Sequence, residues 1–333
     1  MDGLYCILKL FHELKFRSVF CLFLCTISIA QAQNTMKLPE YLKKGDTVAI
    51  VATARKYTLE NLEPSINLLK KWGLEVVVGK TIGLENNQLG GTDLERAADF
   101  QSMVDNANIK AIWCVRGGYG TVKMIDLVDF TKFKKNPKWV VGFSDCTVLH
   151  NHIHNMGVAS LHAIMPINVT SCTPEASESL RAGLFGEKLY YEYPTNPLNR
   201  KGDASGVLVG GNLSVIYSLL GSKSAIDTRG KILFIEDLDE YLYHIDRMMM
   251  NLKRNGYFDG LKGLIVGGMS DMHDNEIPWG KNALEIIREI ANEYDFPISF
   301  DFPAGHIHDN KTLILGKKVI LKVHENGSSL EFE

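Results

Sequence analysis

The chain alternates short apolar runs with segments of helical periodicity, and this alternation limits the folds open to it. Runs rich in valine and isoleucine are typical of strands buried on both faces, whereas the intervening segments place apolar residues three to four positions apart. In the first half, strands are predicted over 47–52, 74–78, 109–115 and 138–143, and helices over 59–72, 93–104 and 148–156. Strands alternating with helices form right-handed βαβ units around a parallel sheet. We therefore predict an α/β fold.

A turn-rich segment over residues 170–204 separates this half from a second one, and we predict an interdomain connection there. The alternation then resumes. Strands are predicted over 206–209, 231–235 and 263–267, helices over 242–252 and 281–294, and a closing β-hairpin around Asn326-Gly327. A length of 333 residues also favours two domains. We expect an N-terminal α/β domain over 37–169 and a C-terminal β/α domain over 205–333.

The first 32 residues differ in character from the rest. A region containing Lys9, Lys15 and Arg17 precedes an apolar run over 18–29, and Ala30-Gln31-Ala32 follows. This order is typical of a secretory signal peptide, and the apolar run is too short for a comfortable membrane span. We predict cleavage after residue 32 and a periplasmic or secreted protein without a stable membrane span. The alternative is a cytoplasmic protein whose translation starts at Met36.

Charge and metal-binding residue types exclude some functions. A formal net charge of −3 gives no electrostatic case for nucleic-acid binding. Several histidines suggest zinc at first sight: His150, His152, His154 and His162. No acidic residue joins them at H-E-x-x-H spacing, so we expect no metal and no other cofactor. Beyond the signal peptide three cysteines remain without a C-x-x-C pair, which favours free buried thiols.

A serine stands where a predicted strand becomes a helix. Ser144 follows the apolar run over 138–143, and helical spacing begins a few residues later. At such a corner the side chain projects, and free N–H groups of the first helical turn face any approaching group. This arrangement suits a nucleophile, although the G-x-S-x-G pattern lacks its last glycine. The alternative is that Ser144 or Asp145 only caps the helix.

Three downstream and upstream elements could complete such a site. The loop Arg116-Gly117-Gly118-Tyr119-Gly120 could supply an N–H to an oxyanion hole, bind a phosphate or form a tight turn, although no P-loop lysine follows it. Glu236 ends a predicted strand and could cap a turn or orient a histidine. His306 lies in a polar loop and could act as a general base or stay on the surface. Ser…Glu…His is a workable order for a catalytic triad.

Several blocks of the chain resemble the LD-carboxypeptidases and the related microcin C immunity peptidases. Besides the glycine loop, they are Gly142-Phe143-Ser144-Asp145, Gly210-Gly211-Asn212-Leu213, Phe234-Ile235-Glu236-Asp237, Tyr243-His244-Ile245-Asp246-Arg247-Met248 and Gly305-His306. The resemblance implies a triad of Ser144, Glu236 and His306, with oxyanion donors from the backbone of Asp145 and Gly118. It also implies a flavodoxin-like N-terminal domain, a smaller C-terminal β/α domain of the swivelling type, and a homodimer.

The same resemblance implies a function. We expect hydrolysis of an L,D peptide bond in murein tetrapeptides with release of terminal D-alanine, and Arg116 or Arg247 is expected to hold the substrate carboxylate. Departures from the family pattern at Ala52-Thr53-Ala54, Ile307 and Ile314-Leu315 concern the substrate pocket. One alternative is cleavage of aminoacyl-nucleotides of the microcin C kind. Another is a non-catalytic periplasmic peptide-binding protein.

Overall fold

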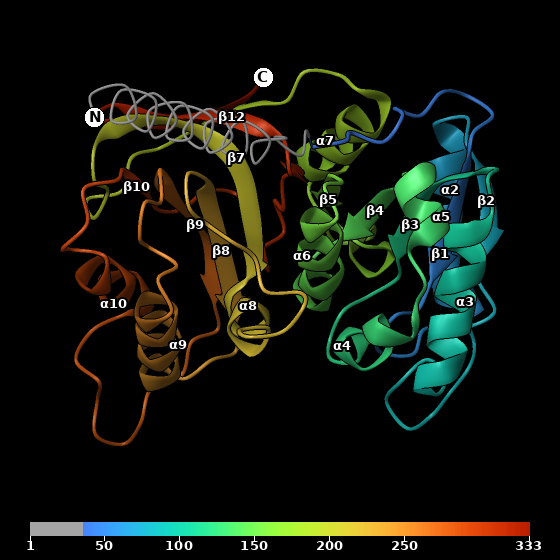
Figure 1. Ribbon diagram of the computed structural model, residues 1–333, viewed down its shortest axis with the longest axis horizontal. Helices are drawn as coiled ribbons and strands as arrows, with labels where there is room; N and C mark the ends of the chain where they lie inside the picture. Colours follow the sequence, from blue (N-terminus) through green and yellow to red (C-terminus); the bar gives the residue numbers. More distant parts are fainter. Residues whose placement is uncertain (1–35) are drawn as a thin grey trace, which may run out of the picture. The chain divides into compact units, whose positions relative to one another are not determined.

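The computed structural model describes residues 36–333, and the signal peptide predicted over 1–32 lies outside them. The first of two sheets has the strand order β11-β5-β4-β3-β1-β2 (Figure 1). Its strands are β1 (Thr47–Val51), β2 (Glu75–Val78), β3 (Ile109–Cys114), β4 (Trp139–Gly142), β5 (Ser160–His162) and β11 (Leu313–Leu315). Strands β1 to β5 run parallel and β11 antiparallel. The predicted parallel α/β sheet is confirmed.

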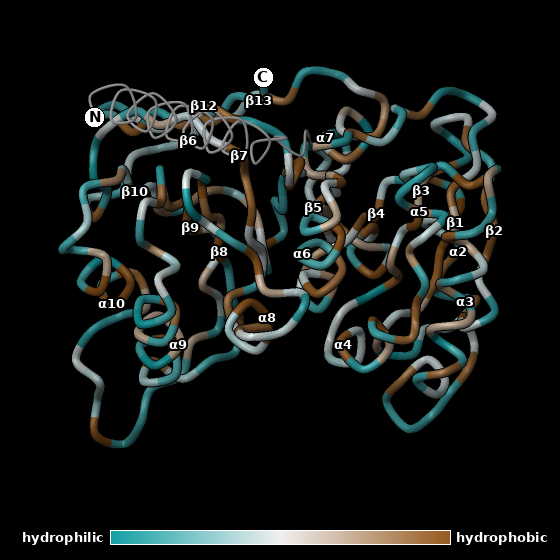
Figure 2. Tube along the Cα trace, viewed as in Figure 1, coloured by the Kyte–Doolittle hydropathy of each residue, from teal (hydrophilic) through white to brown (hydrophobic). Residues whose placement is uncertain are grey.

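Three of the helices that connect these strands begin and end near the predicted positions: α2 (Leu59–Lys71), α3 (Asp93–Asp105) and α6 (Thr147–Asn155). The segment between β3 and β4, where no helix was predicted, contains α4 (Thr121–Met124), a short 3₁₀ helix η1 (Ile125–Leu127) and α5 (Thr131–Lys135). Capping residues account for two of the starts. The Thr58 hydroxyl accepts from the backbone N–H of Asn61, and Thr92 and Glu95 form a capping box. Figure 2 shows the apolar residues concentrated on the strands of this half.

Helix α3 buries a partly polar face. Its Arg96 side chain is fully buried and donates hydrogen bonds to the carbonyls of Thr53 and Gly120. The carboxylate of Asp99 accepts from the backbone N–H groups of Lys80 and Thr81. Loop backbone at the carboxyl edge of the sheet needs partners when it is buried, and this helix supplies them. The helix thereby ties the end of the glycine loop to the loop after β1.

The second sheet has the order β10-β9-β8-β7-β12-β13-β6. Its strands are β6 (Tyr190–Tyr193), β7 (Gly202–Asn212), β8 (Ile232–Leu238), β9 (Gly263–Ser270), β10 (Ile298–Ser299), β12 (Lys318–His324) and β13 (Gly327–Phe332). Strands β7 to β10 are parallel, and β12, β13 and β6 add an antiparallel half. Helices α8 (Leu213–Ser218), α9 (Leu242–Arg254) and α10 (Ala283–Ile290) pack against the parallel half in one apolar cluster (Figure 1). The predicted closing hairpin is confirmed.

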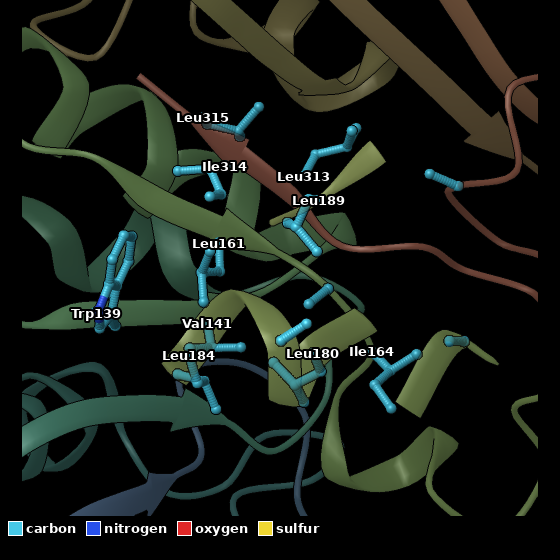
Figure 3. Close-up of a cluster of buried hydrophobic side chains, with 14 of the residues drawn as sticks. Trp139, Val141, Leu161, Ile164, Leu180, Leu184, Leu189, Leu313, Ile314 and Leu315 are labelled. Atoms are coloured by element: carbon cyan, nitrogen blue, oxygen red, sulfur yellow. The ribbon is translucent and has the colours of Figure 1, made fainter. Parts of the chain in front are cut away.

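Two features differ from the sequence-based expectation. The connection predicted over 170–204 contains helix α7 (Pro174–Phe185), strand β6 and the start of β7. Pro174 occupies the first helical turn, where a missing N–H costs nothing, and Thr173 caps it. In addition, β11 lies late in the chain yet pairs with β5 of the first sheet. Figure 3 shows the reason, because leucines of α7 and β11 share one apolar cluster with Trp139, Val141 and Leu161.

No helix within residues 36–333 is both long and apolar enough to span a membrane.

Candidate active site

Ser144 occupies a strained backbone position between β4 and α6. It opens the 3₁₀ helix η2 (Ser144–Cys146) with a φ of +62°, a left-handed conformation that is costly for a residue with a Cβ. This is the strand-to-helix turn expected of a nucleophile. The packing of the residue at the last position of the G-x-S-x-G pattern accounts for the absence of a glycine there. The residue there, Cys146, is fully buried, and its Sγ lies 2.7 Å from where a Cβ on Gly142 would stand. The thiol therefore fills the space that Gly142 leaves.

Neither Ser144 nor Asp145 acts as the simple helix cap considered from the sequence. The residue before α6 is Cys146, which makes no side-chain capping bond. The Asp145 carboxylate instead accepts from the backbone N–H of Thr121, at the start of α4, over 2.8 Å. That bond fixes the glycine loop, which leads into α4, against the segment that carries Ser144.

The three residues predicted as a triad meet in one hydrogen-bonded chain. His306 Nε2 lies 3.1 Å from Ser144 Oγ, and His306 Nδ1 lies 2.6 Å from Glu236 Oε2. The backbone N–H of His306 also donates to Glu236 Oε2, over 3.2 Å. An ionised carboxylate can only accept, so Nδ1 carries the proton and the Nε2 lone pair faces the serine hydroxyl. Serine comes from the first sheet, and the other two come from β8 and a loop near the second.

Burial and mutual charge set the pKa values of the pair in opposite directions. Burial alone would raise the pKa of Glu236, but the charge and hydrogen bond of His306 outweigh it and the pKa falls below its ordinary value. Burial alone would lower the pKa of His306, but the charge and hydrogen bond of Glu236 raise it. The glutamate is therefore ionised beside an imidazole that protonates readily. Nearby Asp237 has its pKa raised to about 7 by burial and by the charge of Glu236.

Glycines allow the backbone to approach these groups closely. Gly305 has a φ of +107°, and a Cβ there would lie 2.7 Å from Glu236 Oε2. A Cβ on Gly211 would lie 2.4 Å from Thr147 Oγ1, the hydroxyl that accepts from the backbone N–H of Asn212 over 2.9 Å. The end of β7 is thereby held against the start of α6. Gly305 thus lets the loop that carries His306 approach Glu236, and Gly211 lets β7 approach α6.

The glycine loop passes directly beside Ser144. A Cβ on Gly117 would lie 2.9 Å from Ser144 Oγ and 3.3 Å from the backbone nitrogen of Asp145. Within residues 36–333, the backbone N–H groups of Gly118 and Asp145 make no hydrogen bond. Unpaired N–H groups beside a serine hydroxyl are the components of an oxyanion hole. The assignment of Gly118 and Asp145 as the oxyanion donors stays a prediction.

A cavity of about 500 Å³ opens above these residues. Ser144 and His306 lie in its wall together with Arg55 and Arg116 from the first half and Asp237 and Glu240 from the second. Arg55 was not among the predicted site residues, although its place just after β1, at the carboxyl edge of the sheet, is where such sites form.

The two predicted substrate-binding arginines lie in different surroundings. Arg116 lines the cavity, and burial together with the charge of Arg55 lowers its pKa. No ion pair to Arg55 or Arg116 is found within residues 36–333. Arg247 is exposed on α9, where its guanidinium lies 5.4 Å from the ring centre of Tyr243, and it does not line the cavity. The arrangement favours Arg116, with Arg55, over Arg247.

Two of the four histidines that suggested zinc make other contacts. His150 contacts the Ser160 hydroxyl and the Gly142 carbonyl through its two ring nitrogens, each over 2.8 Å, and His152 contacts Ser224. No group of three or more side chains of the types that bind metals gathers in the part of the chain that the structure describes.

Comparison with known proteins identifies the family. The model of the LD-carboxypeptidase N-terminal domain matches residues 48–163, and that of the C-terminal domain matches residues 205–321. The probable murein peptide carboxypeptidase of Bacillus subtilis is 34% identical over 88% of this chain and 94% of its own. The microcin C7 self-immunity protein MccF of Escherichia coli is 24% identical over 87% of this chain and 94% of its own.

A solved structure gives the same result. The muramoyltetrapeptide carboxypeptidase of Oxalobacter formigenes superposes with a TM-score of 0.79 and 25% identity, covering 86% of this chain and 98% of that one. Both family models, the sequence relatives and this fold agree with the resemblance inferred from the motif blocks. The chain belongs to the LD-carboxypeptidase family of serine-type peptidases.

Proposed function

We propose that the protein cleaves the L,D peptide bond before the terminal D-alanine of murein tetrapeptides, with Ser144, His306 and Glu236 as its catalytic triad. The observation that carries this proposal is the chain of contacts from Ser144 Oγ through His306 to Glu236 Oε2, at 3.1 Å and 2.6 Å, in the wall of a cavity. The names of its relatives, murein peptide carboxypeptidase and muramoyltetrapeptide carboxypeptidase, support the choice of substrate.

The residues have distinct tasks in this mechanism. Ser144 Oγ attacks the carbonyl carbon while His306 Nε2 takes its proton, and the same nitrogen then protonates the leaving amine of D-alanine. Water hydrolyses the acyl-enzyme by the same route. Glu236 holds the imidazole in the required tautomer and stabilises the imidazolium. The N–H groups of Gly118 and Asp145 stabilise the tetrahedral oxyanion, each contributing roughly 3 kcal/mol.

Arginine in the cavity fits a substrate that ends in a free carboxylate. Arg55 and Arg116 bring two positive charges beside Ser144 with no acidic partner among residues 36–333. Guanidinium groups bind carboxylates through paired hydrogen bonds, and a carboxylate would offset their mutual repulsion. We assign the terminal carboxylate of the peptide to Arg116. Arg116→Ala is then expected to raise KM roughly 10- to 100-fold, whereas Arg247→Ala leaves it unchanged.

The decisive test is the release of D-alanine from a purified murein tetrapeptide. Ser144→Ala is expected to lower kcat about 10⁴- to 10⁶-fold, because the nucleophile is lost. Ser218→Ala serves as the matched control, since Ser218 is exposed on α8 and its hydroxyl only donates to the Val215 carbonyl. Undiminished D-alanine release by Ser144→Ala would refute the assignment.

A second candidate substrate is an aminoacyl-nucleotide of the microcin C kind, supported by the similarity to MccF. Turnover of an aminoacyl-sulfamoyl adenosine, measured beside that of the murein tetrapeptide, separates the two. The third alternative, a peptide-binding protein without chemistry, loses its support through membership of a peptidase family. Labelling of Ser144 by a serine-directed phosphonate would count against it directly.

A further inference from the structure

A second histidine is buried directly behind the triad. His162 ends β5, is fully inaccessible to solvent, and stands opposite Gly142 in β4 and Leu313 in β11. Its ring centre lies 5.7 Å from that of Phe143 and 4.9 Å from that of Phe234. The Phe143 ring also lies 4.8 Å from the ring of His306. The two histidines therefore contact the same phenylalanine next to Ser144.

Buried polar atoms of His162 and of two side chains near it lack partners. Within residues 36–333, both ring nitrogens of His162, Glu236 Oε1 and Asn310 Nδ2 make no hydrogen bond although each is buried. Asn212 is close enough to lower the pKa of Glu236, but its amide donates to Asp237. Buried polar atoms without partners are rare in folded proteins. Several such atoms close together indicate that a small side-chain adjustment would let them form hydrogen bonds with one another.

The unpartnered atoms complement one another chemically. Glu236 Oε1 can only accept, and Asn310 Nδ2 can only donate, because the Oδ1 end of Asn310 already accepts from the backbone N–H of Gly305 over 2.8 Å. A neutral imidazole offers one donor and one acceptor, which is what these two neighbours require. Gly305 also borders Glu236 Oε2, so Asn310 is anchored to the same loop that carries His306.

His162 has the protonation state that this pairing needs. Burial lowers its pKa to about 4, although the charge of Glu236 works in the opposite direction. The ring is therefore neutral under ordinary conditions. The side chain of Asn310 lies close enough to the ring to act on the pKa of His162.

We propose that His162 is a positioning residue of the active site, which donates its ring N–H to Glu236 Oε1 and accepts from Asn310 Nδ2, directly or through one buried water. The chain of contacts then runs from Asn310 through His162, Glu236 and His306 to Ser144. Glu236 presents one oxygen to each histidine, so its carboxylate cannot rotate away from His306. This inference rests on the proposed triad and concerns how its acid is held.

The pairing has a measurable electrostatic consequence. A donor on Oε1 draws negative charge away from the oxygen that faces His306. Its removal makes the carboxylate a stronger base and raises the pKa of His306 further. The other charged group that acts on His306, Asp237, is unchanged by a substitution at His162. The acid limb of kcat/KM, which reports deprotonation of His306 in the free enzyme, should therefore move to higher pH.

The test compares His162→Leu with His162→Asn and His162→Gln, whose amides restore a donor near one or the other ring nitrogen. His162→Leu is expected to lower kcat/KM for the murein tetrapeptide roughly 10- to 100-fold, as loss of a supporting hydrogen bond does in other active sites, and to shift the acid limb upward. At least one amide variant is expected to recover the limb. A folded leucine variant with the native rate and limb would overturn the proposal, as would equal losses in all three variants without a shift.

Two measurements keep this test independent of the substrate assignment and of folding. The rate at which a serine-directed phosphonate labels Ser144, followed against pH, reports the same limb even if murein peptides are not turned over. Nitrogen-15 NMR of the imidazoles in the unsubstituted protein needs no variant at all. His162 is expected to stay neutral from pH 5 to pH 9 as a single tautomer with one hydrogen-bonded N–H. Titration of His162 near pH 6.5, its ordinary range, would contradict the proposal.

Discussion

The two sheets contribute to the site by different physical means. The first sheet provides Ser144 through backbone geometry, with a φ of +62° and a glycine loop close enough that a Cβ on Gly117 would stand 2.9 Å from the hydroxyl. The second provides Glu236, fully buried on β8, and His306, which the glutamate holds by two hydrogen bonds. The first half holds Ser144 in a strained backbone conformation, whereas the second half holds the buried charge of Glu236.

This difference shows which half depends on the other. The turn at Ser144 is set by local residues of β4, η2 and α6. The glutamate and the histidine also hold one another locally. The two halves meet where the end of β7 contacts α6, with the N–H of Asn212 donating to Thr147 Oγ1, and where β11 pairs with β5. Catalytic activity therefore depends on the contacts between the sheets. Each half can keep its own fold when activity is lost.

The largest expected effect comes from removing one group of each half. Ser144→Ala and His306→Ala should each lower kcat about 10⁴- to 10⁶-fold, and the double variant should be hardly worse than either, because the groups act as one unit. Release of D-alanine under saturating substrate measures all three. Additive losses would show that the serine and the histidine work independently, and the proposed triad would then be wrong.

A smaller effect is expected from a glycine that serves only the second half. In Gly305→Ala the new Cβ would lie 2.7 Å from Glu236 Oε2, so the carboxylate must move. A displacement of this order costs roughly 100-fold in kcat. Gly157→Ala is the matched control, because its φ of +79° is similarly left-handed but no atom lies within 4 Å of the added Cβ. Equal activity losses in both variants would attribute the effect to backbone strain alone.

Much of the fold could be predicted because its signals are local. Buried strands such as β1 and β4 are unbroken apolar runs, and helices such as α3 begin at capping residues. The face that α3 buries was harder to predict from the sequence. Apolar Leu94 is 70% exposed, whereas the charged residues Arg96 and Asp99 are buried. Partners for loop backbone, which periodicity does not show, decide that orientation.

The parts that could not be predicted depend on distant packing. Strand β11 has three residues, and only its neighbours in the first sheet make it a strand. For the site, motif order and family resemblance brought Ser144, Glu236 and His306 together as candidates. They could not indicate the left-handed turn at Ser144, the place of Arg55 in the cavity, or His162 behind Glu236. The positions of Arg55 and His162 follow from strand order, which no single stretch of residues records, whereas the φ at Ser144 follows from how β4, η2 and α6 pack around it.

Acid stability gives a further contrast between the two halves. Three histidines of the first half are buried, His150, His154 and His162, and burial lowers their pKa values to about 3, about 4 and about 4. Each is neutral when folded but binds a proton when unfolded below pH 6.5, so its contribution is present above that pH and is lost as the pH falls towards 4. For the Glu236–His306 pair, the raised pKa of His306 stabilises the folded state below pH 6.5. The depressed pKa of Glu236 does so above pH 4.5.

The first half should therefore dominate the response to acid. At pH 5 each buried histidine is expected to lower the free energy of unfolding by about 2 kcal/mol relative to pH 7.5. Urea unfolding at the two pH values measures this loss. His154→Leu should reduce it by about the contribution of one histidine, because the replaced ring is buried and its Nδ1 has no partner within residues 36–333. His324→Leu, exposed on β12, should leave the loss unchanged, since no buried imidazole is removed. An identical acid response in the native protein and in His154→Leu would show that this histidine is already protonated, or hydrated, in the folded state.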